Sequence, residues 1–341
     1  MDIQKELFAL SAIPAVPGRE YLIVQELRGR LAHYGEAKTN PLGGVMCKID
    51  GRGPHILLDA HIDEIGLIVT GVDDKGFVKF TKCGGADARV LMAAGVTVWG
   101  REPLFGVVCS VPPHLEKPED AIKLPDFAEI AIDIGRGAEE AKKIVSPGDR
   151  ITLKDESKLL LNGRLSGKAF DDRAGVVAVL RALELIFESG ARPDLTVSFS
   201  SQEELGTRGA GPAAFSAKPE QAIAVDVSYA LTPDSPAHKC GELGKGVMIG
   251  VAPALDYDMT EELKAIAAEK NIPHQLEVMG GESGTNADPI SVSGDGVKSA
   301  LLSVPLRYMH TAVETVSPSD IESAAKLIAE YVIKNSGENY V

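Results

Sequence analysis

The order of apolar and polar residues changes twice along the chain, which divides it into three stretches. In the first stretch, we expect the first thirty-odd residues to be helical, because residues 19–35 carry leucine and valine near helical spacing and end in glycine. Residues 43–51 and 55–66 follow as two short apolar runs, and the second shows little polar alternation. Such a run is typical of a strand that is covered on both faces. The first stretch therefore predicts an α/β arrangement.

The second stretch, from about residue 67 to residue 161, contains short β segments that are separated by glycine. Residues 66–84 predict two strands around an Asp-Lys-Gly turn, and further short segments follow at close intervals. These segments are residues 95–100, 104–111, 128–135 and 149–153. Because little helical periodicity accompanies them, we expect a compact β-rich domain.

The third stretch returns to alternating helices and strands. Residues 173–190 predict a long helix with a broad apolar face. Residues 317–333 predict the last helix, in which Ser319 and Glu322 match a capping box. Between these helices, strands are expected at residues 195–201, 222–228 and 300–308, and a further helix at residues 260–271.

The three stretches predict a mixed-sheet α/β fold with an insertion. Residues 1–66 and 165–341 are expected to fold together as one domain, interrupted by a β-rich insert at residues 67–164. The chain has 341 residues and 44% of them are hydrophobic, which allows one substantial core and a second, smaller one.

The composition excludes several classes of function. The formal net charge is -14 and no run of lysine or arginine stands out, so we expect neither nucleic acid nor an anionic membrane surface as a partner. No apolar stretch is long enough for a membrane span, and the N-terminal residues lack the pattern of a secretory signal. The four scattered cysteines form no CxxC pair and are expected to be free thiols, which favours the cytoplasm.

Side chains of the kinds that bind metal ions gather at predicted strand ends and in glycine-rich turns. They are His61, Asp63, Glu64, Asp171, Asp172, Glu203, Glu204, Asp226 and His310. Each is weak evidence alone, because a single histidine beside a strand is usually structural. One carboxylate of the Asp171–Asp172 pair is expected to serve a helix N-terminus, where the helix dipole favours it. Asp226 is more informative, since a carboxylate inside an apolar strand needs a cation or several donors.

The adjacent carboxylates Glu203 and Glu204 could be no more than a solvated strand end. However, neighbouring side chains on an extended chain point to opposite faces, which predicts two different roles. Two histidines and several carboxylates without cysteine suit zinc, cobalt or manganese in a hydrolytic site. A two-metal site needs a bridging carboxylate, terminal ligands and a further carboxylate that takes a proton from water. The HExxH, GxSxG and P-loop signatures are absent from the sequence.

With these residues the chain resembles the dinuclear-metal aminopeptidases of metallopeptidase family forty-two, the TET aminopeptidases. The resemblance rests on five segments in this order: AHIDEIG, GKAFDDRAG, QEELGTRGA, AVDVS and PLRYMHTAVE. It implies a three-layer α/β/α catalytic domain with an inserted PDZ-like domain. It also implies two divalent ions per subunit, zinc first and cobalt or manganese as alternatives. The implied substrates are short peptides with a free N-terminus, and the implied assembly is a dodecamer built from dimers.

Five of the matching positions would be metal ligands by this resemblance. His61 and Asp226 would be the terminal ligands of one ion, and Glu204 and His310 those of the other. Asp171 would bridge the two ions.

Two further positions would take part in catalysis. Asp63 would accept a hydrogen bond from the metal-bound histidine and fix its orientation, and Glu203 would be the general base. Asp172 matches a variable position and is left out of the ligand set. The chain also departs from the commoner family pattern, because Asn286 replaces an aspartate and Asp288 follows it. That difference either affects substrate selectivity or leaves Asn286 to serve a turn.

Three alternatives to an aminopeptidase remain open. A glycosidase would use two carboxylates that flank a sugar, and it would need neither the histidines nor a buried Asp226. A carboxypeptidase or deacylase would share the metal ligands but needs an arginine for a substrate carboxylate, and no sequence feature selects one. A non-catalytic assembly scaffold predicts losses among the site residues, and none of the seven matching positions is lost.

Overall fold

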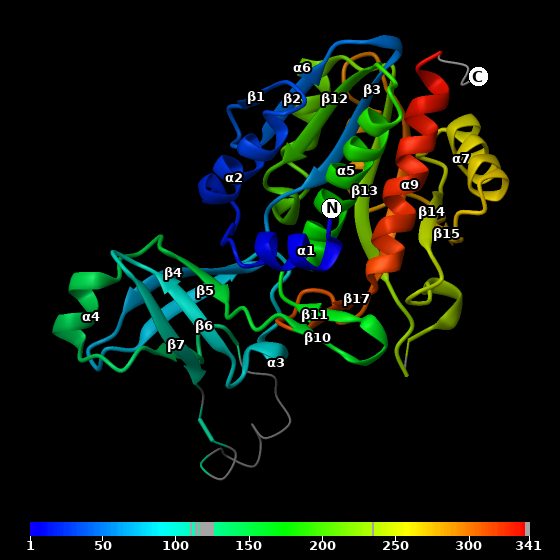
Figure 1. Cartoon of the computed structure of the whole chain (residues 1–341). Coiled ribbons are helices and arrows are strands. Elements are labelled where there is room, and N and C mark those ends of the chain that lie inside the picture. The colour runs from blue at the N-terminus through cyan, green and yellow to red at the C-terminus, as the bar shows by residue number, and fades with distance from the viewer. Residues whose placement is uncertain (110, 113–114, 116–125, 234, 338–341) are drawn as a thin grey trace.

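The computed structural model describes residues 1–109, 111–112, 115, 126–233 and 235–337. Figure 1 shows an α/β body around one large sheet, with a small β body at its side. This arrangement confirms the expected mixed α/β fold with a separate small antiparallel β domain. Among the helices of the described residues, none combines the length and apolarity needed to cross a membrane. Ser110, in the predicted strand at 104–111, lies outside the described residues.

The large sheet has eight strands in the order β1-β2-β12-β3-β13-β16-β14-β15. Its four central strands, β12, β3, β13 and β16, are parallel, while β2 and β14 run antiparallel to their central neighbours. The bounds are β1 (Glu36–Thr39), β2 (Val45–Ile49), β3 (Arg52–His61), β12 (Pro193–Ser200), β13 (Gln221–Tyr229), β14 (Val247–Val251), β15 (His274–Val278) and β16 (Lys298–Leu306). The carboxyl ends of the central strands therefore meet at one edge of the sheet.

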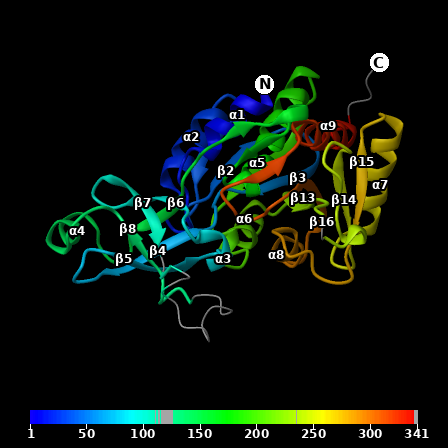
Figure 2. The ribbon, with the colours of Figure 1, turned by 90° about the horizontal axis from the view of Figure 1, so that it is seen from below.

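Helices cover the two faces of this sheet unequally. One face packs against five helices, which are α1 (Ile3–Ser11), α2 (Tyr21–Leu31), α5 (Phe170–Glu188), α7 (Tyr257–Glu269) and α9 (Pro318–Asn335). The other face packs against the short helices α6 (Ala210–Ala217) and α8 (Ala287–Ser291). Figure 2 shows α6 and α8 across the sheet from α1, α5 and α9. The thinner cover leaves room for a cavity on this second face.

The apolar run of β3 explains why the sheet is buried on both faces. Alternate strand residues point to opposite faces, so Ile56 and Leu58 join the core beneath the five helices. Leu57 points the other way and packs against Ala210 and Ala214 of α6. Ile56, Leu57 and Leu58 are each at most 1% exposed, as the absence of polar alternation in this run predicts.

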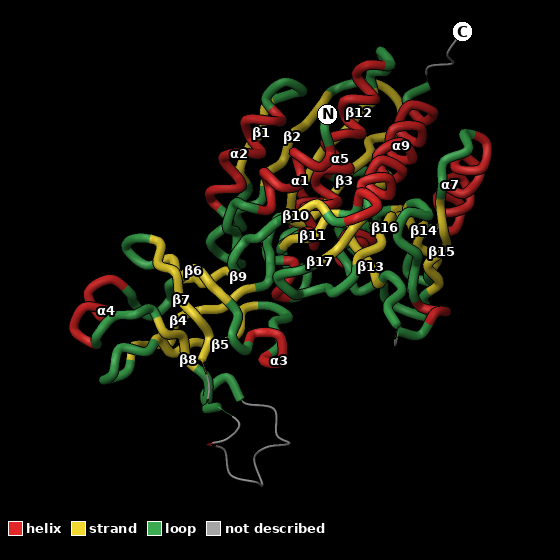
Figure 3. Tube along the Cα trace, turned by 60° about the horizontal axis from the view of Figure 1, so that its bottom comes forward, coloured by secondary structure: helices red, strands yellow, loops and turns green. Residues whose placement is uncertain are grey.

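The small β body is a closed six-stranded barrel in the order β4-β5-β8-β7-β6-β9. Its apolar residues form a hydrophobic cluster separate from the core of the large sheet. Its elements are β4 (Gly66–Val72), β5 (Val78–Cys83), α3 (Ala88–Leu91), β6 (Gly95–Trp99), β7 (Pro103–Cys109), β8 (Ala131–Asp133), α4 (Ala138–Ile144) and β9 (Arg150–Leu153). Figure 3 shows these strands apart from those of the large sheet.

A third, small sheet joins the end of the predicted insert to the α/β body. It consists of β10 (Lys158–Leu159), β11 (Leu165–Gly167) and β17 (Glu314–Val316). β10 lies within the predicted insert but pairs with β11, on the other side of the predicted boundary at residue 165. The domain limits at 66/67 and 164/165 stay a prediction.

One local prediction, the capping box of the last helix, is wrong. Helix α9 begins at Pro318 and its N-cap is Ser317, whose side chain makes no capping hydrogen bond. The hydroxyl of Ser319 contacts that of Ser317 instead, and Glu322 accepts a hydrogen bond from Arg181. Proline at the first helical position sets the start of the helix, which places Ser319 inside its first turn.

Candidate metal centre

The polar side chains singled out in the sequence meet at the carboxyl edge of the four central strands. His61 is the last residue of β3, and Asp226 lies near the end of β13. The two glutamates follow β12 in the turn η3 (Glu203–Leu205), and His310 follows β16. Asp171 lies at the start of α5. Segments that are far apart in the sequence thus supply one cluster of imidazole and carboxylate groups.

The first group of possible metal ligands contains His61, Asp171 and Asp226. Nε2 of His61 lies 3.0 Å from Oδ1 of Asp171 and 3.9 Å from Oδ1 of Asp226. All three side chains are buried. Their ligand atoms lie within 4.8 Å of one another, which is compact enough for one ion to contact all three.

The second group contains Asp171, Glu204 and His310. Nε2 of His310 lies 3.3 Å from Oδ2 of Asp171 and 3.2 Å from Oε1 of Glu204. Asp171 therefore directs one carboxylate oxygen to His61 and the other to His310. A carboxylate in this position can bridge two ions.

Asp63 supports this cluster through the backbone. The N–H groups of Glu203 and Glu204 donate to its two carboxylate oxygens, at 2.9 Å and 3.0 Å. Nδ1 of His61 lies 3.0 Å from the backbone carbonyl oxygen of Asp63, but 3.7 Å from its Oδ1. A carbonyl oxygen only accepts, so Nδ1 carries the proton and Nε2 faces Asp171. The carboxylate of Asp63 binds the next turn and also lies beside the imidazole, so its expected role in orienting His61 stays a prediction.

Glu314, which the sequence analysis did not single out, supports the second group of possible ligands. Like Asp63, it accepts hydrogen bonds from the backbone of two candidate ligands. Its carboxylate accepts the backbone N–H of His310 at 2.9 Å and that of Asp171 at 3.1 Å. Glu314 is 1% exposed, and β17 places it opposite Gly167 of β11, close to the start of α5. The glutamate stands in the quoted segment PLRYMHTAVE, but nothing in the sequence indicates that it binds backbone.

The expectation that Glu203 and Glu204 point to opposite faces is wrong for this structure. These residues form a 3-10 turn rather than an extended segment, because Gln202 turns the chain with a left-handed φ of 59°. Both side chains face the cluster, and both lie within reach of His61. A difference in role must therefore come from their contacts. Glu204 contacts His310, whereas Glu203 has no such partner among the described residues.

The charges of the cluster shift the pKa values of its members. Burial opposes the charged form of His61, but its contacts with Asp171 and Asp63 outweigh burial and hold its pKa well above the usual value. The same balance raises the pKa of His310 to about 11, through Asp171 and Glu204. Burial raises the pKa of Glu203 to about 7, and the negative charges of Glu204 and Asp171 add to this effect while His61 opposes it.

Two neighbouring carboxylates, Asp172 and Glu64, make hydrogen bonds that stabilise the fold. Asp172 accepts the backbone N–H of Gly175 at 2.9 Å, in the first turn of α5, which confirms that one member of the aspartate pair serves the helix start. Glu64 accepts hydrogen bonds from Lys168 at 2.7 Å and from the backbone of Ala15 at 3.0 Å.

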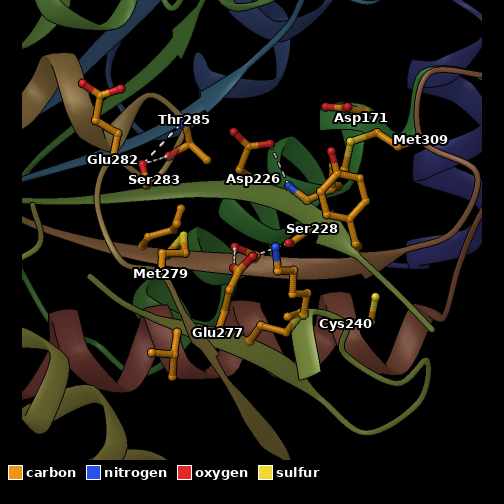
Figure 4. Close-up of a pocket in the computed structure, with 18 of the residues that line it drawn as sticks. Asp171, Asp226, Ser228, Cys240, Glu277, Met279, Glu282, Ser283, Thr285 and Met309 are labelled. Carbon is orange, nitrogen blue, oxygen red and sulfur yellow. Dashed lines mark hydrogen bonds between the residues drawn. The ribbon is translucent and has the colours of Figure 1, made fainter. Parts of the chain in front are cut away.

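A cavity of 540 Å³ opens beside the cluster on the face of the sheet that α6 and α8 cover. Six of the residues discussed above line it, which are His61, Asp171, Glu203, Glu204, Asp226 and His310. Figure 4 shows Asp171 and Asp226 along this cavity, together with Met309 from the segment after β16. A bound molecule would therefore contact the cluster directly.

Comparisons with known proteins agree with this geometry. A family model described as M42 glutamyl aminopeptidase matches residues 43–327. The chain belongs to this family. The lysyl aminopeptidase of Pyrococcus furiosus is 32% identical over 323 residues, which cover 92% of each chain. As a member of the M42 family, the chain is an aminopeptidase, a hydrolase that acts on peptide bonds.

Solved structures of TET aminopeptidases share the fold. One from a marine sediment archaeon of the Thaumarchaeota has a TM-score of 0.92 at 29% identity, and the match covers 97% of this chain and 96% of that chain. The TET1 peptidase of Pyrococcus horikoshii, which can assemble into a tetrahedron or a large octahedral shell, has a TM-score of 0.87 at 30% identity. That match covers 98% of this chain and all of the other.

The donor set suits the metal ions that an M42 peptidase implies. Two imidazoles and four carboxylates form three overlapping groups, and Asp171 is common to two of them. Asp226 also fits a site for a cation. Burial and the charge of Asp172 raise its pKa well above the usual value, so its charged form needs a stabilising partner. A divalent ion would stabilise this buried carboxylate in its charged form.

At Asn286, where the chain departs from the commoner family pattern, the side chain binds neighbouring strands rather than its own turn. Its side chain is 2% exposed, and Nδ2 donates to Oδ2 of Asp59 and to the hydroxyl of Ser200, both at 2.8 Å. Asn286 thus faces neither the cavity nor its own turn. Asp288 binds the turn instead, through the backbone N–H groups of Ser283 and Gly284.

Proposed function

We propose that this M42 aminopeptidase removes the N-terminal residue from short peptides by using two divalent ions and Glu203 as general base. His61 and Asp226 would hold one ion, Glu204 and His310 the other, and Asp171 would bridge them. The observation that carries the proposal is the position of Asp171, whose two carboxylate oxygens face different histidines. We propose zinc as the first candidate, with cobalt or manganese as alternatives.

The ions would supply Lewis acid chemistry, which lowers the pKa of water and polarises the scissile carbonyl group. Glu203 lines the cavity beside the cluster but does not pair with either histidine, so its carboxylate is available to accept a proton. It takes the proton of the attacking water and later returns it to the leaving amine. Asp63 keeps Glu203 in place through the backbone N–H of the turn.

The substrate must present a free amino group at this site. Carboxylates surround the cluster, and the net charge of the chain is -14, which supports attraction of a cationic peptide N-terminus. An N-acetylated peptide has lost that charge. We therefore propose that only peptides with a free N-terminus are cleaved.

We also propose a homo-oligomer of this chain, formed from dimers that assemble into a dodecamer. The tetrahedral assembly of the Pyrococcus horikoshii relative supports this proposal. Enclosure of the active sites in such a shell would restrict substrates to short peptides. The four cysteines are free thiols, which supports a reducing compartment such as the cytoplasm.

The proposal is tested with chromogenic aminoacyl substrates and short peptides, before and after removal of metal by a chelator. Chelation should abolish hydrolysis, and added zinc, cobalt or manganese should restore it. N-acetylated copies of the same peptides should resist cleavage. Full activity after chelation would contradict the metal mechanism, and cleavage of cellulose-type oligosaccharides instead of peptides would favour a glycosidase.

Two single substitutions separate the proposed roles of the adjacent glutamates. Glu203→Gln should keep both ions and lower kcat by a factor of about 10² to 10⁴, because proton transfer is lost. Glu204→Ala should lose affinity for one ion. Metal content is measured by mass spectrometry alongside kcat. Equal metal contents in the two variants would show that the division of roles is wrong.

A further inference from the structure

The cavity beside the candidate metal ligands has a second polar group. Glu277, Ser228 and Ser303 line the same cavity. The Glu277 carboxylate accepts a hydrogen bond from the Ser228 hydroxyl, and a second from Ser303 at 2.8 Å. Figure 4 shows the Glu277 carboxyl group directed at Ser228. The cavity therefore has a fixed carboxylate outside the metal cluster.

The strand register explains how Glu277 reaches this position. Directly paired residues of neighbouring strands point to the same face of a sheet. Glu277 of β15 pairs with Gly250 of β14, and β16, on the other side of β14, carries Ser303. Ser303 pairs with Met248, two residues before Gly250 on β14, so Glu277 and Ser303 point to the same face of the sheet. The two serine hydroxyls then hold its carboxylate in one place.

The distance from the metal cluster to the Ser228 and Glu277 side chains matches the length of a basic side chain. Ser228 follows Asp226 by two residues on β13, so both point to the same face, roughly 7 Å apart along the strand. A lysine side chain has a flexible four-carbon stem, and arginine is slightly longer. A peptide whose free amine lies at the metal cluster can therefore extend its first side chain to Glu277.

The charge of Glu277 is not neutralised by the described part of the chain. Its hydrogen-bond donors are two uncharged hydroxyls, and none of the described lysine, arginine or histidine residues forms an ion pair with it. Lys239 also lines the cavity, but it is exposed and lies on the 3-10 turn η4 (Ala237–Lys239). A carboxylate with free acceptor sites binds an ammonium or guanidinium group strongly.

We propose that Glu277 is a specificity-determining residue that selects peptides whose N-terminal residue is lysine or arginine. The inference rests on the proposed function, because it assumes that the peptide amine lies at the metal cluster. It deepens that function by naming the substrate class. The cavity, the strand register and the unpaired carboxylate together support it.

The test compares kcat/KM for lysyl, arginyl, norleucyl and glutamyl p-nitroanilides on the metal-loaded, full-length protein. Norleucine is the uncharged comparator, because its side chain is an unbranched four-carbon chain without an ammonium group. We expect the lysyl substrate to exceed the norleucyl substrate by a factor of about 10 to 100. Glu277→Gln should reduce this ratio to near one and leave norleucyl hydrolysis unchanged.

Glu282→Gln separates a specific contact from general acidity, since it removes one negative charge from an exposed position on the same cavity. Equal loss of the lysyl preference in the two variants would overturn the role of Glu277. A wild-type preference for glutamyl over lysyl substrates would point to Lys239 and would also overturn it. If no aminoacyl substrate is cleaved, the proposed function itself fails. If norleucyl is cleaved without a lysyl preference, only this inference fails.

Discussion

Two buried carboxylates hold the site together through main-chain hydrogen bonds. Asp63 binds the backbone N–H groups of the two glutamates, and Glu314 binds those of Asp171 and His310. Hydrogen bonds to charged acceptors are stronger than those between neutral groups, so each carboxylate fixes two residues at once. The side chains of the candidate ligands remain free to bind ions.

Residue type and position were enough to predict most of the side chains that the structure brings together. The histidines and carboxylates at strand ends were identified because parallel strands bring their carboxyl ends together. Glu314 could not be found in this way, since its partners are backbone groups, which any sequence has. The contact of Asn286 could not be predicted either, because its partner Asp59 lies 227 residues away and on another segment.

Glu20 leads to a prediction for the pH dependence of stability. It is 4% exposed, and burial raises its pKa from 4.5 to about 7, against the opposing effect of backbone hydrogen bonds to Gly18 and Gln202. The folded state therefore binds this proton more tightly than the unfolded state. Deprotonation of Glu20 therefore lowers the free energy of unfolding as the pH rises from about 4.5 to about 7, by about 3 kcal/mol in total.

Glu20→Gln should remove this dependence. We expect the variant to be more stable than the parent protein at pH 8 and about equal to it at pH 4.5. Urea unfolding of both proteins at several pH values, in the presence of a chelator, measures the difference. The prediction fails if the difference in unfolding free energy between the two proteins does not change with pH.

At the scale of elements, long apolar strands and helices were predictable and short or strained ones were not. The run of β3 and the helical face of α5 were found because their periodicity is extended over many residues. The turn η3 was missed because one left-handed residue, Gln202, converts an extended segment into a 3-10 turn. The short helices α6 and α8, which shape the cavity face, are too brief for a clear periodic signal.

The loop after β5 reaches from the barrel to the metal centre. A Cβ atom at Gly85 would lie 2.4 Å from Nδ1 and 2.5 Å from Cε1 of His310, so only glycine allows this approach. Gly84 lies against Glu204 in the same way, because a Cβ atom at that position would be 3.2 Å from Cβ of the glutamate. The barrel thus contacts two of the candidate ligands.

Gly85→Ala should displace the His310 imidazole from Asp171 and Glu204. We expect affinity for one ion to fall by about 10- to 100-fold, as is usual when the support of a ligand is removed. Gly71→Ala is the matched control, because a Cβ atom there has no neighbour within 4 Å. Metal titration of both variants measures the effect. Equal affinities in the two variants would contradict the prediction.

At the scale of the whole molecule, the change of pattern near residues 67 and 165 predicted a separate β body, because short strands with little helical periodicity replace the alternation of strands and helices. What the sequence could not predict is how the barrel meets the large body, since those contacts join residues from distant segments. Apolar side chains are exposed both on the barrel and beside it, and a partner subunit could cover them: Phe105, Val107, Leu159, Leu160 and Leu161.

Assembly leads to a prediction for the mass in solution. Size-exclusion chromatography with light scattering should give about twelve times the 36.0 kDa of one chain, or a dimer as its building unit. Leu161→Asp, at a side chain that is 89% exposed, should favour smaller species without unfolding the chain. A monomer of the unsubstituted chain at micromolar concentration would contradict the proposed oligomer.

The approach of Gly85 to His310 limits how this architecture can be recombined. Consider a chimera that takes its barrel from one relative and its large sheet from another. Its metal centre would contain a mismatch unless the loop after β5 and the segment after β16 came from the same parent. Exchange of barrels between relatives is therefore expected to preserve the metal centre only when both segments are taken from one parent.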